Sequence, residues 1–152
     1  MTPRLISKKV VSDRLSWVEK LITEIRSLPL HSYQEFIGDS RNVWSAESCL
    51  RRSLEALLDI GRHILAKGFG TGVTEYKEIA QRLDEVGVLS PSDAGILRIL
   101  AGYRNRLIHF YHEIGEEELY KICKEQIGDL EIVRDAYIRW LKDHPNKIDE
   151  RL

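Results

Sequence analysis

The sequence has few of the residues that hold small proteins together by covalent or metal bonds. Its two cysteines, Cys49 and Cys123, lie far apart and have no CxxC or Cys/His spacing nearby, so we expect reduced core thiols rather than a disulfide. The five histidines show no His-x3-His spacing, and no metal site or other cofactor is expected. A chain of 152 residues buries enough surface to fold without either, which predicts one domain over residues 1–152.

Long hydrophobic runs and a strong excess of one charge are also missing. No run resembles a signal peptide or reaches the roughly 18 apolar residues that a membrane span needs, which predicts a cytoplasmic protein with no membrane partner. The net charge of −1 argues against binding nucleic acid over the whole surface. Residues 1–30 are the more basic part and residues 116–152 the more acidic, so a polyanion would favour the first segment and the "RNRLIH" stretch.

Apolar residues instead recur at helical spacing through most of the chain, and no segment alternates as a strand does. This pattern predicts an all-α protein, a five-helix up-and-down bundle. The expected helices are one carrying the stripe from Val11 to Ile25, a long one over Phe36–Lys67, one over Thr74–Glu85, one from Pro91 to Gly115, and one from Glu116 to Leu141.

Turn and capping residues separate these segments. Ser32 opens "SYQE", a capping-box pattern, and Gly38 is the expected interruption near the start of the long helix. Ser90 and Pro91 suit the N-cap and first position of the fourth helix. The glycine-rich "GFGTG" at 68–72 is interpreted as a turn and not as a phosphate-binding loop, because no strand precedes it and no GK[ST] follows.

The stretch "RNRLIHFYHEI", residues 104–114, places arginine, asparagine, histidine and tyrosine among apolar neighbours that favour burial. Imidazoles exchange protons near neutral pH, so His109 could take a proton from a ribose 2′-hydroxyl or give one to a leaving oxygen. Arg104 could hold a phosphate through forked hydrogen bonds. Asn105 lies four residues before His109 and shares its helix face, so its amide could orient the ring.

The spacing of Arg104, His109 and Tyr111 forms the pattern Arg-x4-His-x-Tyr on a late helix. Together with "AESCLRRSLEALLDIGRHIL" at 46–65, it resembles the HEPN superfamily, and within it the HepT toxin branch. The resemblance implies a metal-independent endoribonuclease that cleaves RNA as a homodimer, with Arg104 and His109 as catalytic residues. It also implies a nucleotidyltransferase antitoxin that can attach AMP to Tyr111. The alternative is a non-catalytic HEPN module that binds a nucleotide or docks the nucleotidyltransferase.

Two questions stay open at the level of sequence. On an ideal helix, at about 100° per residue, Arg104 and His109 point roughly 140° apart. Either the helix is locally widened, or it ends near His109, or a second subunit completes the pair, and the resemblance favours the dimer. The carboxylates of Glu55 and Asp59 could support their own helix by ion pairs at four-residue spacing, or they could fix Arg104.

Overall fold

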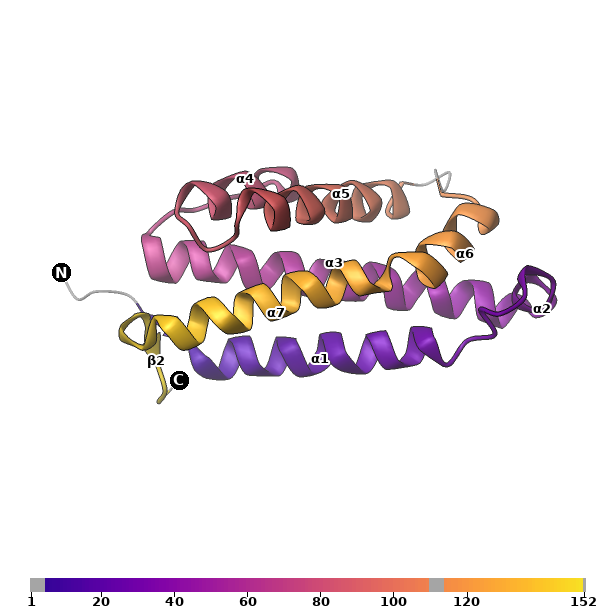
Figure 1. The fold of residues 1–152 in the computed structure, drawn as a ribbon, viewed down its shortest axis with the longest axis horizontal. Coiled ribbons are helices and arrows are strands. Elements are labelled where there is room, and N and C mark those ends of the chain that lie inside the picture. The colour runs from indigo at the N-terminus through magenta and orange to yellow at the C-terminus, as the bar shows by residue number, and fades with distance from the viewer. Residues whose placement is uncertain (1–4, 110–113, 152) are drawn as a thin grey trace.

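The computed structural model describes residues 5–109 and 114–151, and most of these are helical. Four long helices run side by side, and shorter ones cover their ends (Figure 1). The all-α prediction is confirmed, but the count of five helices is wrong, because the described residues form seven α-helices and one short 3-10 helix. They are α1 (Lys8–Arg26), α2 (Tyr33–Ile37), α3 (Ser40–Phe69), α4 (Tyr76–Glu85), α5 (Pro91–Leu107), α6 (Glu116–Glu125), α7 (Ile127–Asp143) and η1 (Pro145–Lys147).

Two of the expected helices are each divided in the structure. The segment expected as one helix over Phe36–Lys67 breaks after Gly38, and the Asp39 carboxylate caps α3 by accepting a 2.9 Å hydrogen bond from the Arg41 N–H. The last expected helix breaks at Gln126, between α6 and α7. Gln126 accepts a 2.9 Å hydrogen bond from the Tyr103 hydroxyl, so a contact with α5 stabilises this corner.

The predicted caps are confirmed where a side chain was expected to start a helix. Ser32 accepts a hydrogen bond from the Glu35 N–H at the start of α2, and Ser90 accepts one from the Asp93 N–H at the start of α5. The end of α3 falls in the glycine-rich turn, where Gly70 has φ 66°. Glycine takes this left-handed conformation at no steric cost, which is why the helix stops there.

The fourth expected helix is shorter than the sequence suggested. α5 ends at Leu107 instead of continuing to Gly115, and its last backbone bond runs from the Ile108 N–H to the Arg104 carbonyl at 3.2 Å. His109 therefore follows the helix and is not part of it.

The two ends of the described chain meet in a small sheet that sequence analysis did not predict. Strand β1 (Ile6–Ser7) pairs in parallel with β2 (Ile148–Asp149), and Ile6 lies opposite Ile148. Strands of two residues are too short to show the alternation that identifies a strand. The pairing joins the start of α1 to the segment after α7 (Figure 1).

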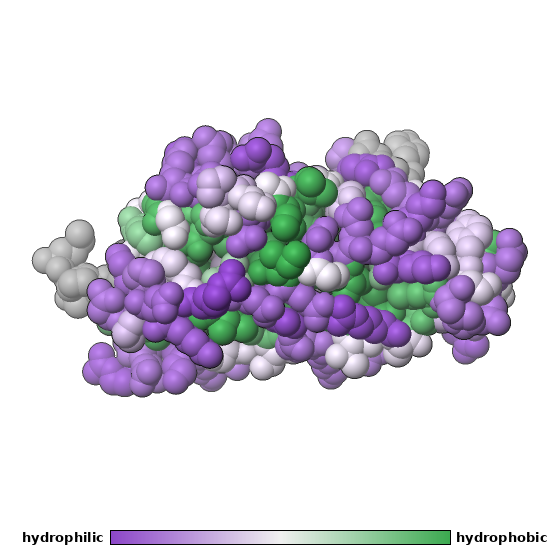
Figure 2. Space-filling view, viewed as in Figure 1, coloured by the Kyte–Doolittle hydropathy of each residue, from purple (hydrophilic) through white to green (hydrophobic). Residues whose placement is uncertain are grey.

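Helix α3 lies at the centre of the core and contacts each of the other six α-helices of the described chain. Its inward row is fully buried and consists of Leu50, Leu54, Leu57, Ile60 and Ile64. Both cysteines are free, as expected, and Cys123 is buried. None of the described helices is long and apolar enough to cross a membrane. On the face seen in Figure 2, hydrophilic residues cover most of the surface, and hydrophobic residues show in a patch near its centre.

Helices α4 and α7 approach the backbone of α3 closely at Gly61. A β-carbon there would lie 2.7 Å from the Tyr137 hydroxyl oxygen, 2.8 Å from Leu83 and 2.9 Å from Ile79. The Tyr137 hydroxyl donates a buried 3.0 Å hydrogen bond to the Leu57 carbonyl. This close packing sets the position of α4, and α4 in turn carries part of the candidate site.

Candidate functional site

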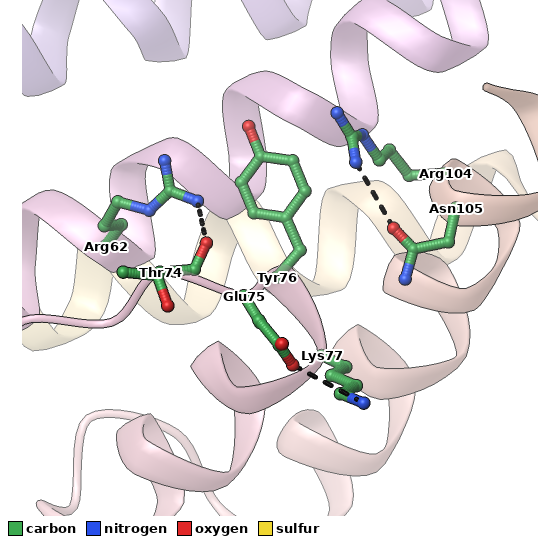
Figure 3. Close-up of a pocket in the computed structure, with 7 residues that line it drawn as sticks. All are labelled: Arg62, Thr74, Glu75, Tyr76, Lys77, Arg104 and Asn105. Atoms are coloured by element: carbon green, nitrogen blue, oxygen red, sulfur yellow. Dashed lines mark hydrogen bonds and ion pairs between the residues drawn. The ribbon is translucent and has the colours of Figure 1, made fainter.

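A polar pocket of about 460 Å³ lies where α3, the start of α4 and the last turns of α5 come together. Figure 3 shows the side chains that line it. They are Arg62 from α3, Thr74 and Glu75 from the segment before α4, Tyr76 and Lys77 from α4, and Arg104 and Asn105 from α5. Two residues of the predicted motif, Arg104 and Asn105, therefore face a pocket formed with segments far away in sequence.

Tyr76 lies between the guanidinium groups of Arg62 and Arg104 (Figure 3). The central guanidinium carbons lie 4.6 Å and 4.3 Å from the ring centre, respectively, which is within the range of cation–π attraction. The Tyr76 hydroxyl donates a 2.8 Å hydrogen bond to Asp59. Burial raises the pKa of Tyr76, and the hydrogen bond to Asp59 raises it further, so the phenol stays protonated as the donor.

The two arginines keep hydrogen-bonding capacity although both are fixed in place. Arg104, whose side chain is 21% exposed, donates to the Asn105 side-chain oxygen at 3.3 Å and lies 3.9 Å from the Glu55 carboxylate. Arg62 donates to the Thr74 carbonyl at 3.2 Å and to Asp59 at 3.5 Å. Within the described part of the chain, the Nε of each arginine is buried without a hydrogen-bond partner.

Glu55 and Asp59, which could either pair along their own helix or fix Arg104, make different contacts in the structure. Glu55 does both, because it pairs with Arg51 at 2.9 Å along α3 and also lies near Arg104. Asp59 contacts Tyr76 and Arg62, so its effect on Arg104 passes through the Tyr76 ring. Both carboxylates thus belong to the surroundings of the pocket.

His109 is exposed and lies in a bend two residues after the end of α5. The 140° separation from Arg104 assumed a regular helix, and that assumption fails because α5 ends at Leu107. The alternative in which the helix ends near His109 is confirmed. The side-chain oxygen of Asn105 accepts a 3.3 Å hydrogen bond from Arg104.

Tyr111 lies outside the described residues.

Arg62, Tyr76 and Lys77 are pocket residues that sequence reasoning did not assign to the site. Arg62 lies in the stretch at 46–65 that contributes to the family resemblance, but no role in the site was expected for it. Tyr76 and Lys77 stand at the start of an amphipathic helix, and their spacing carries no chemical motif. Their role arises from tertiary contact alone. Among the described residues, no group of three or more His, Cys, Asp and Glu side chains is placed to hold a metal ion.

Comparison with known proteins gives a consistent family and fold. The family model described as "Ribonuclease HepT-like" matches residues 18–136. A curated relative, the "tRNA nuclease HepT" of Aphanizomenon flos-aquae (strain 2012/KM1/D3), is 23% identical over 116 residues, which are 76% of this chain and 78% of that protein.

Two solved structures with the same fold are each 18% identical to this chain, with a TM-score of 0.76. One is a tri-AMPylated HEPN toxin of Shewanella oneidensis in complex with an MNT antitoxin, and the match covers 86% of this chain and 97% of the toxin. The other is YutE of Bacillus subtilis, described as a cytosolic protein of unknown function, with 93% and 94% covered. Because the family model spans most of the sequence and includes both Arg104 and His109, the chain belongs to the Ribonuclease HepT-like family.

Proposed function

We propose that this protein is a toxin that cleaves RNA without a metal ion, with Arg104 and His109 as its catalytic residues. The observation that carries the proposal is the position of these two side chains. Arg104 is held by Tyr76 and Glu55 in a polar pocket, and His109 follows directly after the end of the same helix. The family match and the tRNA nuclease relative support the same activity.

The reaction that fits these groups is transesterification within the RNA. The ribose 2′-oxygen attacks the adjacent phosphorus, the bond from phosphorus to the 5′-oxygen breaks, and the 5′-oxygen leaves with a proton. A His109 imidazole can remove the proton from the 2′-hydroxyl, and a second imidazole can supply the proton to the leaving oxygen. Arg104 holds the phosphate and stabilises the charge that builds on its oxygens.

The need for two imidazoles supports a homodimer in which both copies contribute His109. The motif helix exposes apolar surface that a second copy would cover, since Ile99 is 56% exposed and Ile108, just after the helix, is 48% exposed. A two-fold axis near α5 would place the two His109 side chains at one cleft. A mass of 17.6 kDa, that of one chain, by light scattering at micromolar concentration would contradict the dimer.

The activity is tested by incubating the purified protein with total RNA and with tRNA in EDTA. We expect cleavage, and His109→Ala should lower its rate about 10²- to 10⁴-fold. His31→Ala is the matched control, because His31 is an exposed histidine far along the chain that pairs only locally, with Glu35 at 2.7 Å. Binding of RNA or nucleotide with no cleavage by the wild-type protein would favour the non-catalytic module instead.

We further propose that a nucleotidyltransferase antitoxin neutralises the protein by attaching AMP to Tyr111. The Shewanella toxin of the same fold is described as AMPylated and bound to its MNT antitoxin, which supports this regulation. The phenol oxygen would attack the α-phosphorus of ATP, and pyrophosphate would leave. An AMP group close to the motif would compete with RNA for Arg104 through its phosphate.

Tyr111→Phe should therefore keep most of the ribonuclease activity and escape the antitoxin. Mass spectrometry after incubation with the antitoxin and ATP should show an AMP-sized increase on the wild-type peptide and none on the variant. Suppression of the wild-type protein without that mass increase would mean that binding alone neutralises it.

A further inference from the structure

The Tyr76 ring holds two arginines at a fixed spacing. Since each guanidinium carbon lies within 4.6 Å of the same ring centre, the two carbons are at most roughly 9 Å apart. Arg62 also lines a second pocket of about 350 Å³, together with Arg14 and His63. Three arginines therefore line the two pockets in turn, from Arg104 of the motif through Arg62, which lines both, to Arg14, and the Asp59 carboxylate also lines the second pocket.

We propose that the pocket binds two successive phosphates of one RNA strand, with Arg104 on the phosphate that is cleaved and Arg62 on its neighbour. Tyr76 is the positioning residue that sets the spacing between the two guanidinium groups. This inference rests on the proposed ribonuclease function, because it assigns Arg104 to the reacting phosphate. It adds a second phosphate contact on α3, outside the Arg-x4-His motif.

The charges in the pocket favour an anion with more than one phosphate. Three of the seven lining side chains are cationic and one, Glu75, is a carboxylate that pairs with Lys77 at 3.4 Å. Asp59 forms its shorter hydrogen bond with Tyr76, at 2.8 Å, and its contact with Arg62 is 3.5 Å long. The ion pair of Arg62 with Asp59 is therefore a long one, and the Arg62 side chain lines the pocket.

The surroundings of Tyr76 explain why phosphates and not bases fit here. An aromatic ring that stacks on a base needs an open face. Arg62 and Arg104 lie on either side of this ring (Figure 3), so its area is already used to hold cations. The ring attracts both guanidiniums, which would otherwise repel each other, and the Asp59 hydrogen bond fixes its position.

The test measures binding of a single-stranded RNA whose 2′-hydroxyls are all methylated, so that it cannot be cleaved. For single strands, the slope of log affinity against log salt changes by about 0.7 for each phosphate contact. Arg62→Gln should reduce the magnitude of this slope by about 0.7, whereas Arg62→Lys should keep the slope and lower the affinity, because it keeps the charge but not the planar fork.

Arg82→Gln is the matched control. Arg82 lies on α4, pairs with Glu85 at 3.1 Å with the same i,i+3 spacing that joins Arg62 to Asp59, and does not line the pocket. Its removal takes away the same charge from the protein and should leave the salt slope unchanged. An equal change of slope in both variants would overturn the proposal, because it would report net charge instead of a phosphate contact.

The positioning role of Tyr76 is tested by two further variants in the same assay. Tyr76→Phe keeps the ring but loses the hydrogen bond to Asp59, so its affinity should fall less than that of Tyr76→Leu. Tyr76→Leu should lower the affinity about as much as Arg62→Gln does. If Tyr76→Leu binds like the wild type while its circular dichroism melt shows a folded protein, Tyr76 does not set the spacing.

Cleavage assays separate this inference from the proposed function. If the wild-type protein cleaves RNA and Arg62→Gln has an unchanged salt slope, the two-phosphate site is wrong and the ribonuclease stands. If the slope changes as expected but no RNA is cleaved, the binding site stands and the ribonuclease proposal fails.

Discussion

Gly61→Ala should destabilise the protein although it replaces one small residue by another in the middle of a helix. In an open helix position, this change would stabilise by up to about 1 kcal/mol, because alanine is the better helix former. At Gly61, however, three atoms of Tyr137, Leu83 and Ile79 lie within 3.0 Å of where the new β-carbon would be. All of them belong to other helices, so the methyl group can be accommodated only if those helices move.

The size of the effect follows from what must move. Overpacking of a well-packed core costs about 1–3 kcal/mol. Displacing Tyr137 also strains or breaks its buried hydrogen bond to the Leu57 carbonyl, and a buried donor without a partner costs about 1–3 kcal/mol. With the gain in helix propensity subtracted, we expect the free energy of unfolding to fall by roughly 3 kcal/mol. The melting temperature should then fall by roughly 10 °C.

Urea denaturation followed by circular dichroism measures this loss. The matched control is Gly95→Ala, because Gly95 lies inside α5 and a β-carbon there would have no heavy atom within 4 Å. That variant should be as stable as the wild type or slightly more stable. If the two variants have the same stability, the close approach at Gly61 does not limit the packing of α4 and α7 against α3.

The same variant should also affect the candidate site, because Ile79 and Leu83 belong to α4 and Tyr76 begins that helix. A shift of α4 away from α3 would move the Tyr76 ring relative to Arg62. At a temperature where the variant is still folded, its affinity for the methylated RNA should therefore fall. Unchanged affinity in the folded variant would show that the two-arginine arrangement does not depend on this packing.

Two further predictions concern ionisable groups whose pKa is shifted by burial. Burial, and to a smaller degree the charge of Arg14, lowers the pKa of His63 below its ordinary 6.5, and the neutral ring accepts a 3.0 Å hydrogen bond from the Ser7 N–H. The unfolded chain then binds the proton more readily than the folded one, so the free energy of unfolding should fall as the pH drops below about 6.5. Urea melts at several pH values should show that His63→Gln reduces this acid sensitivity. Burial raises the pKa of Cys123 to about 12, so this thiol should react with a disulfide reagent only as fast as the protein unfolds. The partly exposed Cys49 should react sooner. Equal reaction rates of the two thiols in the native protein, measured by peptide mass spectrometry, would contradict this.

Most of the fold could be predicted because its helices begin and end at residues with strong local preferences. Ser32 and Ser90 cap helices as expected, and Gly70 ends the longest one. The break at Gln126 has no proline or capping side chain to reveal it, and the nearest glycine, Gly128, lies inside the first turn of α7 instead of at the break. The hydrogen bond to Gln126 comes from Tyr103 on another helix. Such a break depends on tertiary contacts, which a local pattern does not contain.

Only part of the candidate site could be predicted from the sequence. The motif identified Arg104, and the spacing on α3 identified Glu55 as a possible partner for it. Tyr76 and Arg62 meet at the pocket because α4 packs against α3. A local sequence pattern does not reveal a contact between residues that are far apart in the sequence. The expected end of α5 was wrong because Gly115 gave a clear stop signal and Leu107 gives none.

Because α5 ends early, the two proposed catalytic residues lie in different surroundings. Arg104 lies in the last helical turn, and its guanidinium is held against Tyr76 and near Glu55, so its position is set by the folded core. His109 comes after the helix, where the backbone is no longer fixed by the i,i+4 bonds of a helix. A fixed cation suits a group that must match the geometry of a phosphate, and an exposed imidazole suits a group that must exchange protons with water after each turnover. Extending α5 by stabilising substitutions near its end should therefore impair cleavage more than it impairs binding of the methylated RNA.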